Sequence, residues 1–509
     1  MLEILFGKKS DHPLASLKSV QKLLDDLPKQ DAFKALQELS SWLESLGDNT
    51  EGFRPDHQVA VLRLLDEAAQ PYLRKLLRDF FALPALSTFQ ENLVWGVLSH
   101  YLAHSEQFYF SVVQLCRNAD KSAASLKPHF ALLAARGIAA INLRLKVAAA
   151  RYAVIDPTLW NHLAEIYTFA EAQNIADESI APYSGFGGNS TLKREVAGTL
   201  VWFSVATGNL PPVQIHLAER MIAYLSQYLT VGTKVGEGNQ WAINLLQPSA
   251  PMRVNLETTT HPGMRYVGFS GAEDALNNFV KTLEKGVVPQ EVNLGGAVYD
   301  TGLLLEVAKL LLSRCILPAP MRRSPRRKIQ VNLHIANGFN GVSEKSVNNQ
   351  YISDDNYDIW EVEDISASGF RSVTHLSARE SIKIGSLIGS KPENVESWGV
   401  GIVRRLSQDL SNKLHVGVEV LSNQLINVTL HARDFSAGGE APQALYLNKP
   451  NDKSGEVWLL LKPGVFMPNR SFNMQLGDKV LLLLPQGVAE SGEDYELVRY
   501  RGMEQDTGE

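Results

Sequence analysis

Hydrophobic residues recur every three or four positions along the chain up to about residue 316. Val61, Leu64, Leu65, Ala68 and Tyr72, for example, would lie on one face of a helix at this spacing. The pattern therefore predicts a mostly helical N-terminal half. The segments with this spacing are Leu14–Leu27, Asp31–Leu46, Phe89–Cys116, Leu126–Ala153, Pro157–Ala181, Thr191–Ala206, Val213–Leu229 and Gly271–Leu283.

Past Leu317 the hydrophobic residues alternate with polar ones, which is the period of β-strands. Many short strands without helices between them predict β-barrels or β-sandwiches. Within the helical half, Gly232–Ser270 also has short alternating runs, and it predicts either a small β-sheet or a long ordered loop. The strands expected after Leu317 are Lys328–Ile335, Asp358–Ile365, Ser381–Ile388, Gly399–Leu406, Leu414–Leu421, Ile426–His431, Glu456–Leu461 and Lys479–Leu484.

The two patterns predict an α+β multidomain protein, and 509 residues are enough for three or four domains. We expect a helical domain over residues 1–316, as one unit or as two subdomains that divide near residues 150–190. An antiparallel β-barrel over residues 317–423 and a further barrel-like β module over residues 424–509 follow it. The two prolines of Leu317–Pro320 favour a domain boundary at that point.

The composition is that of a soluble globular protein, with 45% hydrophobic and 20% charged residues and a net charge of −6. A mildly acidic chain is not expected to bind nucleic acid in general, so an anion site requires a local cluster of basic residues. Two cysteines, Cys116 and Cys315, lack metal-binding spacing, which favours a reducing cytoplasm. No apolar run approaches the roughly 20 residues that span a bilayer. We therefore expect a cytoplasmic protein without membrane insertion.

A basic cluster of this kind directly follows the proline-containing boundary. Four arginines and a lysine occur within Arg322–Lys328. Arg322 with Arg326, and Arg323 with Arg327, both have the spacing Arg-x-x-x-Arg. The planar guanidinium group binds phosphate oxygens and guanine O6 and N7 in bidentate fashion, and its face stacks on bases. Taken alone, the segment fits a solvated basic linker better than an anion site.

A second motif stands at the end of a predicted strand. Asp364, Ser366 and Gly369 have the spacing Asp-x-Ser-x-x-Gly. A carboxylate accepts hydrogen bonds from guanine N1–H and N2–H, and a hydroxyl donates or accepts. A glycine permits a backbone conformation, or the approach of a base, that a Cβ atom would block. Taken alone, this motif is typical of a polar turn at the end of a strand.

The two motifs in this order, at the start of a β-rich segment, resemble the PilZ family of cyclic di-GMP receptors. Trp398–Arg405 and His415–Leu421 are similar to later strands of that barrel, so the resemblance covers Met321–Asn423. It implies that the chain binds cyclic di-GMP as a receptor. The residues that it assigns to the ligand are Arg322, Arg323, Arg326, Arg327, Asp364, Ser366 and Gly369.

The resemblance leaves the leading arginine pair open by one residue. We prefer Arg323 with Arg327, because an arginine doublet in front and an arginine entering the first strand are usual in the family, and the pair one residue earlier is the alternative. The gap between the motifs is longer than in the family, since Asn337–Asp358 is interpreted as an extended polar loop. We interpret Trp398 as a core residue and Arg404–Arg405 as surface residues.

Larger PilZ proteins with a helical N-terminal region resemble this layout, and some are linked to type IV pili or surface motility. The resemblance implies an effector whose arginine segment, which also joins the two halves, is ordered by the ligand. This ordering would change how the helical half meets a protein partner that remains to be identified. The alternative is a constitutive adaptor between proteins, with a barrel that binds no ligand.

No arrangement of residues in the sequence indicates catalysis, and we predict no enzyme, no cofactor and no metal site. The motifs of cyclic di-GMP synthesis and hydrolysis, Gly-Gly-Asp/Glu-Glu-Phe and Glu-Ala-Leu, are absent. His100 and His104 have the spacing that places two rings on one helix face. Since the sequence indicates no third ligand, we interpret the pair as structural.

Overall fold

The structure is a computed structural model, and its chain divides into two compact units. The first contains Met1–Thr207 and Pro211–Ala319, and the second contains Gly208–Leu210 and Pro320–Glu509. The predicted α+β multidomain class is confirmed, because a helical half is followed by two antiparallel β-barrels. The residues that the structure describes are 12–48, 53–81, 86–118, 121–183, 188–236, 238–255, 258, 260–289, 292, 299–316, 325–347, 358–432, 441–448 and 455–505.

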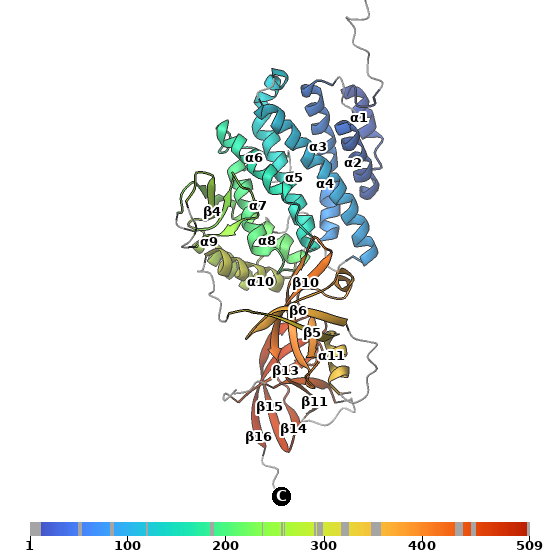
Figure 1. The fold of residues 1–509 in the computed structure, drawn as a ribbon, viewed down its shortest axis with the longest axis vertical. Helices are drawn as coiled ribbons and strands as arrows, with labels where there is room; N and C mark the ends of the chain where they lie inside the picture. The colour runs from blue at the N-terminus through green and yellow to red at the C-terminus, as the bar shows by residue number, and fades with distance from the viewer. Residues whose placement is uncertain are drawn as a thin grey trace, which may run out of the picture. The chain divides into compact units, whose positions relative to one another are not determined.

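The helical half is a stack of α-helices that pack side by side along the chain order (Figure 1). Their ends follow ordinary capping rules. Ser87 starts α4 with a complete capping box, in which its hydroxyl accepts from the Gln90 backbone N–H and the Gln90 side chain accepts in return. The helices are α1 (Leu17–Asp25), α2 (Ala32–Asp48), α3 (Pro55–Phe80), α4 (Thr88–Arg117), α5 (Phe130–Ala150), α6 (Thr158–Ala172), α7 (Leu192–Ala206) and α8 (Pro212–Tyr224).

Helix α3 buries a different stripe from the predicted one. Leu65 is fully buried as expected, but Leu64 is only half-buried. Ala69 is buried, while the predicted Ala68 is only half-buried. The buried stripe also contains Asp66 and Gln70. A hydrophobic pattern does not count these two polar residues, so the predicted face is rotated away from the real one.

The segment predicted as a small sheet or an ordered loop over Gly232–Ser270 contains a sheet. Its strands pair antiparallel in the order β1-β4-β2-β3. Two further helices follow it and complete the described part of the first unit (Figure 1). The elements are β1 (Leu229–Gly232), β2 (Asn239–Asn244), β3 (Met252–Arg253), β4 (Met264–Phe269), α9 (Glu273–Glu284) and α10 (Thr301–Leu311).

The second unit begins with a closed antiparallel barrel in the order β10-β7-β6-β5-β8-β9. Strand β10 shows the alternation of buried and more exposed residues that its sequence period predicts, whereas β8 and β9 begin with runs of buried residues. For example, Leu414, Val416 and Val418 of β10 are buried, while the residues between them are not. The strands are β5 (Arg327–Asn337), β6 (Asp358–Ser366), β7 (Gly369–His375), β8 (Leu387–Pro392), β9 (Gly399–Gln408) and β10 (Lys413–Ser422).

A second closed barrel follows in the order β11-β12-β13-β16-β15-β14. Val457, Leu459 and Leu461 of β13 are buried in its core, together with Phe472 and Tyr500. Closure of each barrel leaves no unpaired edge for association with other chains. The strands are β11 (Leu425–Ala432), β12 (Gln443–Leu447), β13 (Glu456–Leu461), β14 (Phe472–Leu476), β15 (Lys479–Ser491) and β16 (Glu496–Gln505).

A shared hydrophobic core joins the two barrels. Phe339 and Val342 belong to a helix, α11 (Gly338–Val347), and they pack in one cluster with Trp398 of the first barrel and Leu460 of the second. The interpretation of Trp398 as a core residue is therefore confirmed. The interpretation of Asn337–Asp358 as an extended polar loop is wrong for its first part, because the apolar face of α11 fills this core.

The predicted strand Ser381–Ile388 is also wrong over most of its length. A turn lies at Lys383–Ser386, where the Ser386 N–H donates to the Lys383 carbonyl at 3.0 Å. Gly385 has a φ of +88°, a value at which a strand cannot continue. Strand β8 therefore starts only at Leu387. The alternation of hydrophobic residues in this stretch belongs to the turn and not to a strand.

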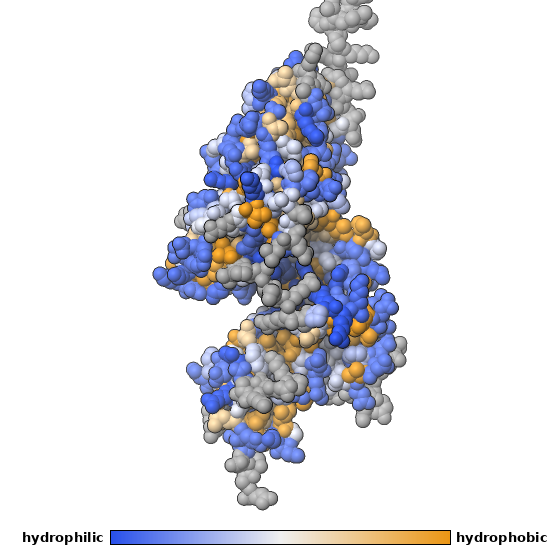
Figure 2. All heavy atoms as spheres, turned by 60° about the vertical axis from the view of Figure 1, so that its left-hand side comes forward, coloured by the Kyte–Doolittle hydropathy of each residue, from blue (hydrophilic) through white to orange (hydrophobic). Residues whose placement is uncertain are grey.

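Hydrophilic residues predominate on the face shown in Figure 2, where hydrophobic residues form separate patches.

Arg404, predicted to lie on the surface, is only 38% exposed and holds the two barrels together. Its guanidinium donates to both carboxylate oxygens of Glu490 at 2.6 Å and to Glu419 at 2.8 Å. Among the described residues, no helix combines the length and the apolar character that a membrane span requires.

Candidate ligand-binding site

The Asp-x-Ser-x-x-Gly motif forms the tip of the hairpin between β6 and β7. Ser366 pairs with Gly369 across the hairpin, so the two residues between them make a tight turn. The Ser366 hydroxyl donates to the Gly369 carbonyl at 3.1 Å. The motif therefore folds into one compact corner at the end of the barrel, as the prediction of a strand end requires.

Asp364 is aimed by two irregularities in the strand pairing. Between β6 and β7, the register shifts between Val362 and Asp364. Between β5 and β6, it shifts between Lys328, which pairs with Asp364, and Val331. Such bulges bend a strand and redirect a side chain, and they are common next to binding sites. Asp364 is consequently 19% exposed, although it belongs to the wall of a closed barrel.

Arg326 is the described arginine that reaches this carboxylate. Its Nη1 donates to Asp364 Oδ2 at 3.2 Å and lies 3.1 Å from Oδ1. Oδ1 is buried, yet it accepts no hydrogen bond of proper geometry from any residue that the structure describes. A carboxylate offers about four acceptor positions. Asp364 Oδ1 can therefore accept further hydrogen bonds, and Arg326 is the described arginine next to it.

The other basic residues add positive charge around this corner. Arg327 and Lys328 begin β5, pair with Ile365 and Asp364, and are both exposed. Arg371 pairs with Asp364 across β6 and β7, but its Nε binds Glu363 at 2.8 Å. Arg322 and Arg323 lie outside the described residues, so their predicted part in the site stays a prediction. We call Arg326, Asp364, Ser366 and Gly369 the Asp364 corner.

The packing of the barrel requires a glycine at position 369, a requirement that the sequence did not reveal. A Cβ atom built on it would lie 2.1 Å from the Val418 carbonyl oxygen of β10. Its φ is not in the left-handed region, so the requirement is space and not backbone conformation. The neighbouring Ser368 carbonyl accepts from the Val420 N–H at 3.0 Å, which holds β10 against the turn.

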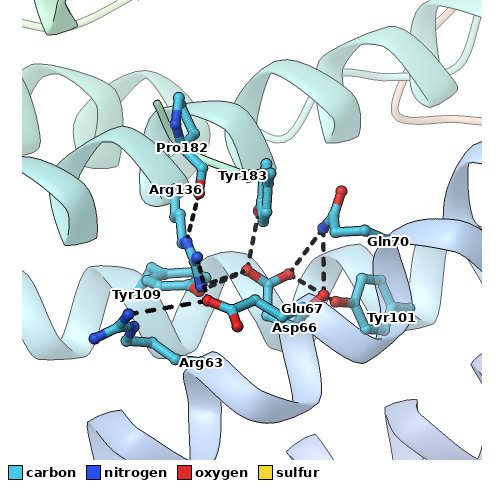
Figure 3. A network of polar contacts seen from close by, with 9 residues as sticks. All are labelled: Arg63, Asp66, Glu67, Gln70, Tyr101, Tyr109, Arg136, Pro182 and Tyr183. Carbon is cyan, nitrogen blue, oxygen red and sulfur yellow. Dashed lines mark hydrogen bonds and ion pairs between the residues drawn. The ribbon is translucent and has the colours of Figure 1, made fainter. Parts of the chain in front are cut away.

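Sequence reasoning missed a second polar cluster, which lies in the helical half (Figure 3). Asp66 on α3 accepts hydrogen bonds from the hydroxyls of Tyr101 at 2.9 Å, Tyr109 at 2.6 Å and Tyr183 at 3.0 Å. The Gln70 amide donates to Asp66 at 3.2 Å, and Arg136 lies 3.6 Å away. The only signal in the sequence was a charged residue at a core position of an amphipathic helix.

The electrostatics of this cluster are those of a sealed interior. Burial of the hydroxyls, followed by the negative charge of Asp66, raises the pKa of Tyr101, Tyr109 and Tyr183 well above the usual 10.0. The tyrosines therefore remain protonated donors at neutral pH. Because each oxygen of Asp66 already accepts two hydrogen bonds from described residues, we interpret the cluster as a structural element.

Comparison with known proteins gives one family match. Residues 18–234 match the family model described as "Cyclic-di-GMP receptor FimW, N-terminal domain". The matched region runs from α1 to just past β1, so it is the helical half that carries the similarity. No curated protein matches the chain. The resemblance drawn from the barrel motifs and the match of the helical half point to the same ligand from two separate parts of the chain.

Proposed function

Since residues 18–234 match a family model of cyclic di-GMP receptors, we propose that the chain binds cyclic di-GMP at the Asp364 corner. The observation that supports this location is the Asp364 carboxylate. It is partly exposed, it faces Arg326, and one of its oxygens accepts no hydrogen bond from the described residues. The ion pair with Arg326 compensates this oxygen only in part, and a ligand with N–H donors would add hydrogen bonds to it.

The chemistry of the ligand fits this corner. Guanine N1–H and N2–H form a pair of donors that a carboxylate accepts side by side. Arg326 and Arg327, together with Arg322 and Arg323 just before them, supply guanidinium groups for the two phosphates and for guanine O6 and N7. The Ser366 hydroxyl donates to a carbonyl and keeps its lone pairs for a further donor.

The ion pair between Arg326 and Asp364 does not oppose binding strongly. The arginine is 47% exposed, and an ion pair of this kind is worth about 0.2–1 kcal/mol. A ligand that binds at about 1 μM gains about 8 kcal/mol. The guanidinium therefore leaves the carboxylate at little cost and becomes available for a phosphate or a guanine edge.

The same segment couples the ligand to the helical half in this proposal. Arg322 and Arg323 stand within a few residues of the boundary between the two units, which falls between Ala319 and Pro320. When arginines close on the ligand, the link between the units is held in fewer arrangements. A protein partner that prefers one of these arrangements then binds according to the ligand level. Control of type IV pili or surface motility is the process we propose for this partner.

A second candidate function is a constitutive adaptor, and two observations favour it. Gly369 is required by the approach of β10, and Ser366 holds the hairpin. These motif residues would thus be needed in a barrel that binds no ligand. The intact motif alone therefore supports binding less strongly than the Asp364 oxygen does.

Calorimetric titration of cyclic di-GMP into the purified full chain tests the proposal, with cyclic di-AMP and GTP as controls. Arg326→Ala and Arg323→Ala are the variants, and Arg499→Ala is the matched control. Arg499 is 46% exposed and forms a barrel-surface ion pair with Glu456, as Arg326 does with Asp364. Gly369→Ala is not a useful variant, because the clash with β10 would disturb the barrel itself.

We expect selective binding of cyclic di-GMP that weakens about tenfold to a hundredfold in Arg326→Ala, since charge-assisted hydrogen bonds are worth about 1.5–3 kcal/mol. Arg499→Ala should bind like the parent chain. A dissociation constant of 100 μM corresponds to a binding free energy of about 5.5 kcal/mol. If about 100 μM ligand gives no heat and no competition, the receptor function is wrong and the adaptor function remains. Equal affinities for all chains would locate the site elsewhere.

A further inference from the structure

Helices α2 and α4 bring together three side chains that bind metal ions. Glu44 stands on α2, and His100 and His104 stand on α4. One carboxylate oxygen and one ring nitrogen from each histidine all lie within 4.8 Å of one another. The sequence showed the histidine pair, but the third side chain comes from 56 positions earlier and becomes visible only in the fold.

The two histidines already have the separation that a tetrahedral metal imposes. Their Nε2 atoms lie 3.2 Å apart. Two imidazole nitrogens at 2.0–2.1 Å from one zinc ion, at a tetrahedral angle, are about 3.3 Å apart. The spacing of four residues on α4 places both rings on one face, and their planes are 76° apart. The 3.2 Å contact is a hydrogen bond between the rings, and an ion bound by both Nε2 atoms would take its place.

A buried hydroxyl holds the first of these rings. The Ser40 side chain on α2 is 2% exposed, and its Oγ lies 2.7 Å from His100 Nδ1. When Nδ1 carries the proton and donates to this oxygen, the lone pair of His100 is on Nε2, which is the atom that faces His104. Metal-binding histidines commonly have such a partner on the other ring nitrogen. Helix α2 thus supplies both a ligand and the group that orients another ligand.

We propose that Glu44, His100 and His104 form a binding site for a divalent transition metal of the zinc class, with water in the remaining position. Two imidazoles and one carboxylate favour zinc, cobalt or nickel over the oxygen-preferring magnesium and calcium. Glu44 and His100 are exposed and His104 is half-buried, so the ion has a path from solvent. The ion would clip α2 to α4 near one end of the region matched by the family model.

Cobalt and zinc titrations of the full chain, prepared without a polyhistidine tag, test this site. We expect one equivalent of Co²⁺ to give the intense visible absorption of a tetrahedral site, and Zn²⁺ to displace it. Glu44→Gln and His104→Gln should each weaken metal binding at least tenfold. Ser40→Ala should weaken it less, because it removes an orienting group and leaves all three ligands. His431→Gln is the control, since His431 is an exposed histidine on β11 of the other unit.

A second measurement keeps the test independent of any change in folding. At one fixed Zn²⁺ concentration, the unfolding temperature should rise more in the parent chain and in His431→Gln than in Glu44→Gln, because stabilisation by a ligand decreases with its affinity. The exposed Glu44 side chain should not itself be needed for folding. The proposal is overturned if the parent chain takes up no Zn²⁺ at 100 μM. It is equally overturned if Glu44→Gln and His104→Gln bind the metal as tightly as the parent. Cyclic di-GMP binding is a separate readout, so a failure here says nothing about the Asp364 corner.

Discussion

Asp66 in the helical half and Asp364 in the first barrel are both carboxylates on regular elements, yet their surroundings differ in kind. Asp66 is 1% exposed and accepts from three tyrosine hydroxyls and an amide (Figure 3). Asp364 is 19% exposed and has one arginine as its described partner. A carboxylate with every acceptor position filled stabilises a fold, while one with capacity left is able to bind a ligand. This difference supports the proposal that Asp66 stabilises the fold and Asp364 binds the ligand, without any appeal to the sequence motif.

The largest effect we expect is on stability, in Asp66→Ala. Removing this carboxylate leaves three buried tyrosine hydroxyls without their acceptor, and it leaves the buried Arg136 with Glu67 as its one acidic partner among the described residues. The free energy of unfolding of the helical half should therefore fall by about 3–5 kcal/mol. Urea unfolding of the full chain followed by circular dichroism measures it. Glu361→Ala, an exposed carboxylate on β6, should change stability by less than about 0.5 kcal/mol. A loss below about 1 kcal/mol in Asp66→Ala would show that the cluster is not the anchor we describe.

Asp364→Asn should weaken ligand binding and leave stability almost unchanged, the opposite of what we expect for Asp66→Ala. Asparagine keeps the size of the side chain but replaces one acceptor by a donor, which faces the guanine donors unfavourably. We expect cyclic di-GMP to bind about tenfold to a hundredfold more weakly, because charge-assisted hydrogen bonds of about 1.5–3 kcal/mol are lost. The free energy of unfolding should change by less than about 1 kcal/mol, since the ion pair with Arg326 is half-exposed.

Calorimetry and urea unfolding on the same preparation give both quantities, with Glu361→Ala as the control on the same strand. Unchanged affinity together with a large loss of stability would mean that Asp364 is a second structural carboxylate. The contrast with Asp66 would then disappear, and the ligand site would have to be sought outside the described residues.

Alkaline pH should weaken the Asp66 cluster. The pKa of Tyr183 is raised in the folded chain, by burial first and by Asp66 second, so the folded chain holds this proton after the unfolded chain has lost it. Stability is therefore fully present below about pH 10 and falls as the pH rises further, by up to about 1.4 kcal/mol per pH unit for each such tyrosine.

Tyr183→Phe removes one donor to Asp66 and one of these titrations. It should cost about 1–2 kcal/mol at neutral pH, and stability should then decline less steeply above about pH 10. Urea unfolding at neutral and alkaline pH measures both effects. Tyr224→Phe, an exposed tyrosine on α8, should follow the parent chain. An identical alkaline decline in both variants would show that the cluster does not retain its protons as described.

The difference between the two aspartates also explains what the sequence could predict. Asp364 was a candidate from the sequence because Ser366 and Gly369 stand close to it along the chain, and the structure places all three in one hairpin. The motif is local, so its spacing survives in the fold. Alternation of hydrophobic residues likewise predicted β10, in which every second residue from Leu414 to Val418 is buried. It also predicted β9, although the first five residues of that strand are all buried. The match of the helical half and the α+β class agree with that interpretation.

Features that depend on distant partners could not be predicted in this way. Asp66 is buried because tyrosines 35, 43 and 117 positions later supply its hydrogen bonds, and no local pattern contains that information. Helix α11 was missed because its short apolar face has partners in both barrels. The sequence predicted that Gly369 leaves space for a base or for an unusual backbone conformation. The structure shows that it leaves space for the Val418 carbonyl oxygen, which comes from a distant strand. The predicted role of Arg322 and Arg323 in ligand binding stays a prediction, because both lie outside the described residues.

The smallest effect should come from Ser366→Ala, and it decides how the hydroxyl is used. The backbone pairing of Ser366 with Gly369 keeps the hairpin in place, so the lost hydrogen bond should lower stability by about 0.5–1.5 kcal/mol. If the hydroxyl also contacts the ligand, affinity should fall by a further factor of about three to ten, an effect that calorimetry resolves. Ser372→Ala is the control, because its hydroxyl is buried in β7 and donates weakly to Val416 at 3.5 Å, away from the turn. A loss of stability with unchanged affinity would assign Ser366 to the barrel alone, and Asp364 with the arginines would then account for the whole of the recognition.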